Sequence, residues 1–308
     1  MKLTLHALMI LASLGTSASA GVSVDVDQTL GSSNYRSTRG KISIVLTDSL
    51  YLAPYASTYR SDASSGSFNT FGLRGGYETG PFALGVEAGF QPKTNGYKKT
   101  FAGADATFSL TPGGSKRGRK MAGPSSEGSE TFGAGLAGVD VGGAVRHTRH
   151  SDDLYASGPT GAGRRKAGMT RSSIYTVGQT DLSAFAGARF LITEISAEIT
   201  KSVYDKTLDA ATAREAQSLS LSGFSAFIQG FPETSFNAKL RWKTLPLVKP
   251  YVSYTHTKFK LGAADSDAYE LGGTVGLQML SVKASAQRYK QKGYADQNFF
   301  MLGAGLNF

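Results

Sequence analysis

The sequence contains no cysteine, so its fold is held together without the disulfide bonds on which small secreted domains usually depend. It also lacks any run of 18 or more apolar residues, the length that a membrane-spanning helix requires. Charged residues form only 18% of the chain, against roughly 25% in typical soluble domains. These absences exclude a disulfide scaffold and a helical membrane protein, and they disfavour an ordinary soluble domain.

Glycine, by contrast, is abundant, with 38 among 308 residues, against a usual share of about 7%. The hydrophobic residues, 40% of the chain, are not gathered into solid blocks. They alternate with polar or small residues, as expected of strands that have one face on lipid and the other on water.

The amino terminus has the pattern of a secretory signal peptide. Met1-Lys2 is a short basic start, residues 3–14 are largely apolar, and Ala18-Ser19-Ala20 is a small-residue cleavage site. We therefore expect residues 1–20 to be removed and the mature protein to begin at Gly21 in the cell envelope.

The last nine residues alternate between an apolar face that ends in an aromatic residue and a face of small or polar residues. This stretch resembles the closing strand of Gram-negative outer-membrane β-barrel proteins. The resemblance implies location in the cell outer membrane and assembly by the barrel-assembly machinery. In that family the machinery reads the terminal strand, so the assembly signal here comprises Phe300, Leu302, Leu306 and Phe308.

Seven internal segments alternate without a charge on their apolar face, and their lengths approach the roughly 9–11 residues that a membrane-spanning strand needs. They are 82–90, 102–110, 181–190, 194–200, 236–242, 269–279 and 282–287. Weaker alternation marks 40–46, 50–60, 67–78, 131–146, 217–228 and 249–260. Together with the terminal strand, these segments predict fourteen strands.

We therefore expect residues 21–308 to form one all-β domain, a transmembrane antiparallel up-and-down β-barrel of fourteen strands, with twelve to sixteen possible. Residues 21–38 are interpreted as an arm in the periplasm or the lumen. Alternatively, Val22, Val24 and Val26 form a further strand.

The polar faces of these segments carry charges of both signs, which must be solvated or paired because an isolated buried charge is costly. A hydrated pore meets that requirement, and so does a solid lumen tied by salt bridges. The residues predicted to line the pore are Arg74, Glu87, Asp105, Asp181, Arg189, Glu194, Glu198, Lys239, Arg241, Glu270 and Lys283.

The net charge of +10 is concentrated in two long predicted loops, near 111–130 and 147–173. These loops could pair with lipopolysaccharide phosphates, could fold into the bore and favour anions, or could be solvated without a partner. We expect no nucleic-acid binding in this compartment. The basic loop residues are Lys116, Arg117, Arg119, Lys120, Arg164, Arg165 and Lys166.

One short cluster combines residue types used in hydrolases and metal sites. His147 and His150 lie close to Ser151, Asp152 and Asp153. A nucleophile and its base must be fixed on rigid elements, whereas this cluster is predicted to begin a glycine-rich loop. We therefore expect no enzymatic activity, no metal and no cofactor.

The leading functional hypothesis is a porin-like channel for passive diffusion of small hydrophilic solutes or ions, embedded in outer-membrane lipid. The alternative is a non-conducting structural or surface-interaction barrel whose basic loops bind lipopolysaccharide or other envelope components. An outer-membrane hydrolase ranks third.

Overall fold

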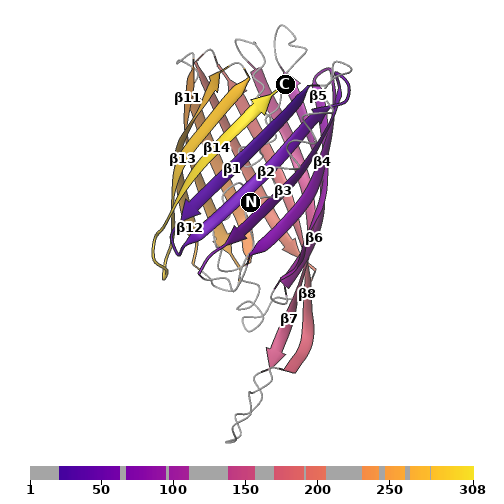
Figure 1. Ribbon diagram of the computed structural model, residues 1–308, viewed down its shortest axis with the longest axis vertical. Helices are drawn as coiled ribbons and strands as arrows, with labels where there is room; N and C mark the ends of the chain where they lie inside the picture. The colour runs from indigo at the N-terminus through magenta and orange to yellow at the C-terminus, as the bar shows by residue number, and fades with distance from the viewer. Residues whose placement is uncertain are drawn as a thin grey trace, which may run out of the picture.

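The computed structural model describes residues 21–62, 67–94, 97–110, 138–156, 170–190, 192–205, 231–242, 247–260, 264–277 and 279–308. These residues form a closed antiparallel β-barrel of fourteen strands, each paired with its neighbours in the chain (Figure 1). Among them, no helix is long and apolar enough to cross a membrane. The fold class and the strand number predicted from the sequence are therefore confirmed.

The strands are β1 (Val22–Gly31), β2 (Tyr35–Val45), β3 (Leu50–Arg60), β4 (Phe68–Thr79), β5 (Phe82–Thr94), β6 (Tyr97–Leu110), β7 (Gly138–Ala156), β8 (Thr170–Arg189), β9 (Thr193–Tyr204), β10 (Pro232–Trp242), β11 (Val248–Phe259), β12 (Ser266–Leu277), β13 (Leu280–Gln291) and β14 (Gln297–Asn307).

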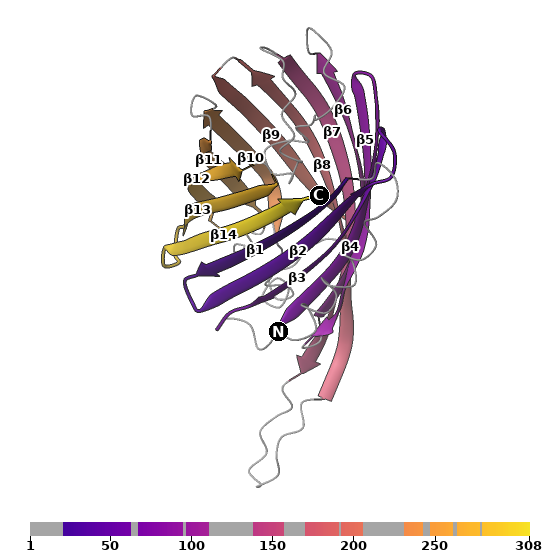
Figure 2. The same ribbon diagram turned by 45° about the horizontal axis from the view of Figure 1, so that its top comes forward.

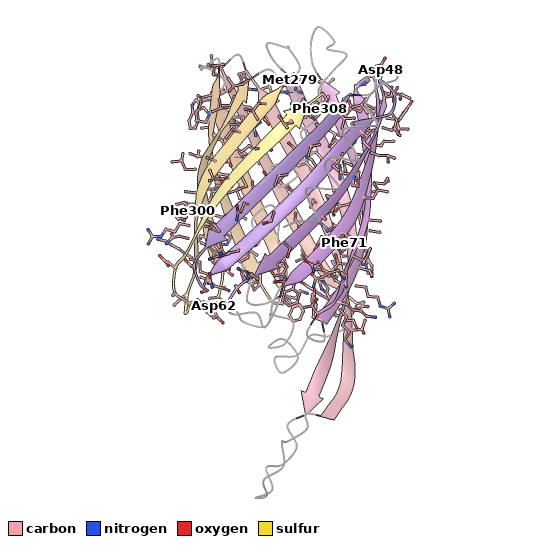
Figure 3. The ribbon with its side chains drawn as sticks, viewed as in Figure 1. Asp48, Asp62, Phe71, Met279, Phe300 and Phe308 are labelled. Carbon is pink, nitrogen blue, oxygen red and sulfur yellow. The ribbon has the colours of Figure 1, made fainter. Side chains whose placement is uncertain are left out.

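The outer face of the barrel is apolar because each strand turns its hydrophobic residues the same way. On β5, Leu84 and Val86 are exposed, whereas the adjacent residue Ala83, which points to the other face, is buried. On β14, Phe300 and Leu302 are exposed by 60% and 65%. Figure 3 shows Phe71 and Phe300 among the side chains of the outer surface. An apolar surface of this extent, free of a covering layer, matches the lipid-facing band of a transmembrane barrel.

The barrel closes where β14 pairs with β1, from Ser23 opposite Asn307 to Gly31 opposite Phe299. The carboxy-terminal residue belongs to this seam. The Phe308 amide donates to the carbonyl of Val22 over 2.8 Å, and the Val22 amide donates back over 3.3 Å. The terminal strand therefore leaves no open sheet edge, which membrane-embedded sheets cannot tolerate.

Residues 21–38 do not form an arm, and the alternative expectation of a strand with Val22, Val24 and Val26 is confirmed. Residues 22–31 form strand β1, and its hairpin to β2 turns at Ser33 and Asn34, which both have positive φ angles of 55° and 53°. Two such residues make the turn type whose twist matches that of paired strands. The fourteen strands of the barrel include β1, and the predicted segment 217–228 lies outside the described residues.

The second predicted loop was also too long, because residues 147–156 and 170–173 belong to β7 and β8. The pair continues to Ala156 opposite Thr170, past the point where β6 and β9 end. The resulting two-stranded ribbon projects beyond the barrel (Figure 2). The basic residues of both predicted loops, from Lys116 to Lys120 and from Arg164 to Lys166, lie outside the described residues.

The two ends of the barrel differ in the length of their connections. Asp48, Met279 and Phe308 mark one end and Asp62 the other (Figure 3). At the end with Phe308 the connections are 46–49, 80–81, 111–137, 190–192, 243–247 and 278–279; at the other they are 32–34, 61–67, 95–96, 157–169, 205–231, 260–265 and 292–296. Apart from 111–137, the end with Phe308 has turns of two to five residues, the pattern of the periplasmic end of such barrels. We call the opposite end the loop end.

Candidate functional site

The candidate site is the inner wall of the barrel. Side chains on the concave face of a curved sheet converge, so residues from alternate strands can meet across the strand between them. Arg74 on β4 meets Asp105 on β6, and Tyr35 on β2 packs on Phe299 of β14. These contacts identify the inner face, and it is the opposite face from the exposed apolar residues.

The Arg74–Asp105 ion pair crosses β5 at a glycine. The guanidinium Nη2 lies 2.6 Å from Oδ2 of Asp105, and its Nε donates to the hydroxyl of Tyr51 over 3.3 Å. A Cβ on Gly85 would fall 2.4 Å from the carboxylate and 2.5 Å from the guanidinium. The absence of a side chain at Gly85 therefore lets the pair lie flat against the wall.

A second network repeats this arrangement one strand along. The Tyr55 hydroxyl on β3 donates to the Glu87 carboxylate on β5, and its ring lies over Gly72 on the strand between. Arg146 on β7 approaches the same carboxylate to 3.8 Å and stacks on the Phe101 ring at 4.2 Å. Glu87 thus joins side chains from three strands along the wall.

At the closing seam, glycines of β14 make room for carboxylates of β1. The carboxylates of Asp25 and Asp27 occupy the spaces that side chains at Gly305 and Gly303 would take. Asp25 also pairs with the Lys41 ammonium at 3.4 Å. The small residues on the inner face of the terminal strand are therefore required by the charges of β1.

The wall formed by β7 to β10 carries ion pairs that are more deeply buried. Nη2 of Arg189 lies 2.8 and 2.7 Å from the two carboxylate oxygens of Asp140, whose side chain is only 1% exposed. Arg241 approaches Glu194 to 3.8 Å, and both are largely buried. Glu198 accepts a hydrogen bond from Thr200 over 3.3 Å. The charges of these two ion pairs are compensated within the wall.

On β10 to β12 the wall combines a cation, an aromatic ring and a carboxylate. The Lys239 ammonium lies 4.0 Å from the centre of the Tyr251 ring. The Tyr251 hydroxyl donates to Glu270 over 2.6 Å, and Ser253 donates to the other oxygen of that carboxylate over 3.1 Å. Cation–π contact is favourable when the cation sits over the ring face in this way.

Near the loop end the inner wall becomes aromatic. Tyr59 stacks on Phe68 with ring centres 5.1 Å apart, and Phe68 meets Tyr97 at 6.3 Å. The Tyr97 hydroxyl lies 2.7 Å from Nδ1 of His150. The row continues through Tyr35 to Phe299, so packed rings follow the wall from β14 to β7.

All eleven residues predicted to line the pore lie on the inner face. Arg189, Glu194 and Glu198 are nevertheless buried within the wall. The prediction missed further inner-face charges, among them Asp25, Asp27 and Arg39 near the amino terminus, and Lys41, Asp140 and Arg146 in the weakly alternating segments 40–46 and 131–146. For β1 the signal was present, because Val22, Val24 and Val26 alternate with Asp25 and Asp27.

The two histidines of the predicted cluster, His147 and His150, do not belong to one site. The two histidines lie on β7 three residues apart, so they point to opposite faces of the strand. His150 contacts Tyr97 on the inner face, and Nδ1 of His147 lies 3.0 Å from the Thr180 hydroxyl on the outer face. The expected loop was wrong here, since these residues are strand. Within the described ranges, no group of three or more His, Cys, Asp or Glu could hold a metal ion.

No protein family matches the sequence, and no curated protein matches it either. Solved structures do resemble the barrel. CdiB from Acinetobacter baumannii has a TM-score of 0.48 at 11% identity over 95% of this chain, which spans 60% of CdiB. A loop-deleted form of OmpT, an outer membrane protein of Vibrio cholerae, has a TM-score of 0.46 at 13% identity. The match covers 94% of this chain and 98% of that OmpT form. OpdO of Pseudomonas aeruginosa has a TM-score of 0.46 at 11% identity, and the match covers 94% of this chain and 96% of OpdO. At such identities the likeness concerns the fold alone.

Proposed function

We propose that this protein is an outer-membrane channel through which small hydrophilic solutes or ions diffuse passively. One observation carries the proposal. Within the described strands, every inner-face ion pair and ring contact named above joins neighbouring or next-but-one strands. Charges held in this way lie along the wall, as expected of a water-filled lumen.

Barrel size supports the same function. About eight strands leave an interior that side chains fill, whereas 16–18 strands leave an aqueous channel. Fourteen strands give an intermediate bore, in which the direction of the side chains decides how much space remains. Inner glycines such as Gly85 and Gly72 let long side chains lie along the wall, which favours a hydrated lumen over a solid one.

The wall carries acids and bases in compensating pairs, so we expect weak ion selectivity. Arg74 with Asp105 and Lys41 with Asp25 present adjacent opposite charges, whose fields largely cancel a short distance into water. Outer-membrane lipid, lipopolysaccharide and the barrel-assembly machinery are the partners that this function implies, and no cofactor is needed for it.

Liposome swelling tests the proposal. The purified, refolded protein is inserted into liposomes, which are diluted into isotonic solutions of sugars of increasing size. A diffusion channel predicts swelling that is fast for a pentose and progressively slower for larger sugars. Swelling no faster than in protein-free liposomes, with a barrel shown to be folded by its altered gel migration before boiling, contradicts the proposal.

A further inference from the structure

The charges on the outer face of the barrel are restricted to its loop end. Among the described strands, outward-facing positions in the periplasmic half are apolar, small or uncharged. Near the loop end, outward-facing cations follow the circumference. They are Arg36, Arg60, Lys98, Arg149, Lys201, Lys258, Arg288 and Lys290.

Two of these cations face each other directly. Arg36 on β2 and Arg60 on β3 are register partners, and both are exposed on the outer surface. Directly opposed residues have Cβ atoms about 4.5–5.5 Å apart, and like charges in that position destabilise a sheet. Neither arginine pairs with a carboxylate among the described residues. Asp62, two residues after Arg60, accepts a hydrogen bond from Asn34 instead.

Two other outward-facing cations differ from this arginine pair because they form salt bridges with acidic residues. Lys201 lies 3.2 Å from Glu233, and Arg288 lies 2.7 Å from Asp296. Arg36 and Arg60 combine two features: they are register partners, and neither has a carboxylate partner among the described residues. Two guanidinium groups held side by side match the several oxygens of one phosphate group, which they can bind through paired N–H donors.

An apolar furrow lies below the arginine pair, toward the middle of the membrane. Gly40 and Ala56 are register partners on the outer face, with Val26 and Phe71 opposite them on the flanking strands. Nothing lies within 4 Å of the position that a Cβ on Gly40 would take. The furrow is four residues, or about 13 Å, along β2 from Arg36. Its position suits an acyl chain whose headgroup sits on the arginines.

From these contacts we infer that Arg36 and Arg60 form a binding site for a phosphorylated glycolipid, the lipid A part of lipopolysaccharide, with one acyl chain over Gly40. The loop end faces the outer leaflet in the orientation given above, and that leaflet holds lipopolysaccharide rather than phospholipid. The site rests on the membrane location in the proposed function, but it does not require an open lumen.

Native mass spectrometry of the refolded full chain in detergent tests the site. The protein is titrated with bis-phosphorylated lipid A, with lipid A stripped of phosphate, and with phosphatidylglycerol. We expect tight binding of the phosphorylated form only. The variant Arg36→Gln with Arg60→Gln should bind it at least about tenfold more weakly, because charge-assisted hydrogen bonds are lost. Gly40→Leu, which fills the furrow and leaves the charges intact, should also weaken binding.

The matched control is Lys201→Gln with Arg288→Gln, which removes two cations that already have acidic partners and should leave binding within about twofold. Altered gel migration before boiling verifies that each variant is folded. Equal binding by the arginine variant and the wild-type protein overturns the inference, and so does equal loss in the control. Equal binding of phosphatidylglycerol also overturns it, since the site would then accept any anionic lipid. Liposome swelling by the same samples reports on the channel separately.

Discussion

Inner-face glycines decide where the charged side chains of the wall can lie. At Gly85, Gly72 and Gly303 the space of a missing side chain is occupied by a polar group from a neighbouring strand. In a strand, glycine usually weakens packing and often marks the close approach of another group. Here the approaching groups are Asp105 and Arg74 at Gly85, Tyr55 at Gly72 and Asp27 at Gly303. The polar side chains of the wall therefore depend on these glycines for the space they occupy.

Gly85→Ala tests this role at a single position. The new Cβ would overlap both partners of the Arg74–Asp105 pair and push them off the wall, so we expect a loss of about 1–3 kcal/mol in the free energy of unfolding. Gly273→Ala is the control, because a Cβ there meets its neighbours at ordinary distances of 3.7–4.0 Å. Urea unfolding in detergent measures both. Equal stability of the two variants would show that Gly85 has no such role.

The buried pair of Arg189 and Asp140 offers a second test at the residue scale. Removing one partner leaves an uncompensated buried charge, so Arg189→Met should lower the free energy of unfolding by about 3–5 kcal/mol. Combining it with Asp140→Leu should restore most of that loss. The exposed pair of Arg288 and Asp296 is the control, and Arg288→Met should cost about 0–1 kcal/mol. A double variant no more stable than the single one would contradict this account.

Among the elements, the hairpin between β1 and β2 was hard to predict from the sequence because its turn residues are a weak signal. Strands β5 and β14 were predictable because no charged residue interrupts the apolar face of their alternation. Gly80 and Pro81 also mark the turn before β5. β1 alternates as well, but its turn residues Ser33 and Asn34 are weaker hairpin signals than Asn-Gly. The inner-face residues Asp25 and Asp27 were lost with that strand. Arg189 and Asp140 illustrate another limit, since alternation places them inside the barrel but cannot pair them.

The same turn yields a prediction at the scale of the element. Ser33 has a φ of 55°, a conformation that costs an L-residue about 1–2 kcal/mol and that glycine adopts freely. Ser33→Gly should therefore stabilise the barrel by about 0.5–1 kcal/mol once the extra entropy of unfolded glycine is included. Ser37→Gly, in the extended part of β2, should destabilise it by a similar amount. Urea unfolding measures the change in the free energy of unfolding for both variants. A change of the same sign in both would exclude the turn conformation as the cause.

At the scale of the whole molecule, the barrel separates three environments. Its outer face is apolar in the membrane-facing band, its loop end carries cations, and its inner face carries paired charges. Alternation in the sequence was enough to predict an apolar outer face and a charged inner face, but not how the inner charges pair. The outward-facing cations at the loop end, which include Arg36 and Arg60, were not predicted, because the net positive charge was assigned to the loops.

Single-channel recording in a planar lipid bilayer tests the central claim, a water-filled lumen, most directly. Because the named inner-face contacts of the described strands run along the wall, insertion of one folded barrel should produce a discrete step in current, with weak preference between cations and anions. Insertion of folded protein, verified by its altered gel migration before boiling, without any such step would contradict the account and make this a closed barrel.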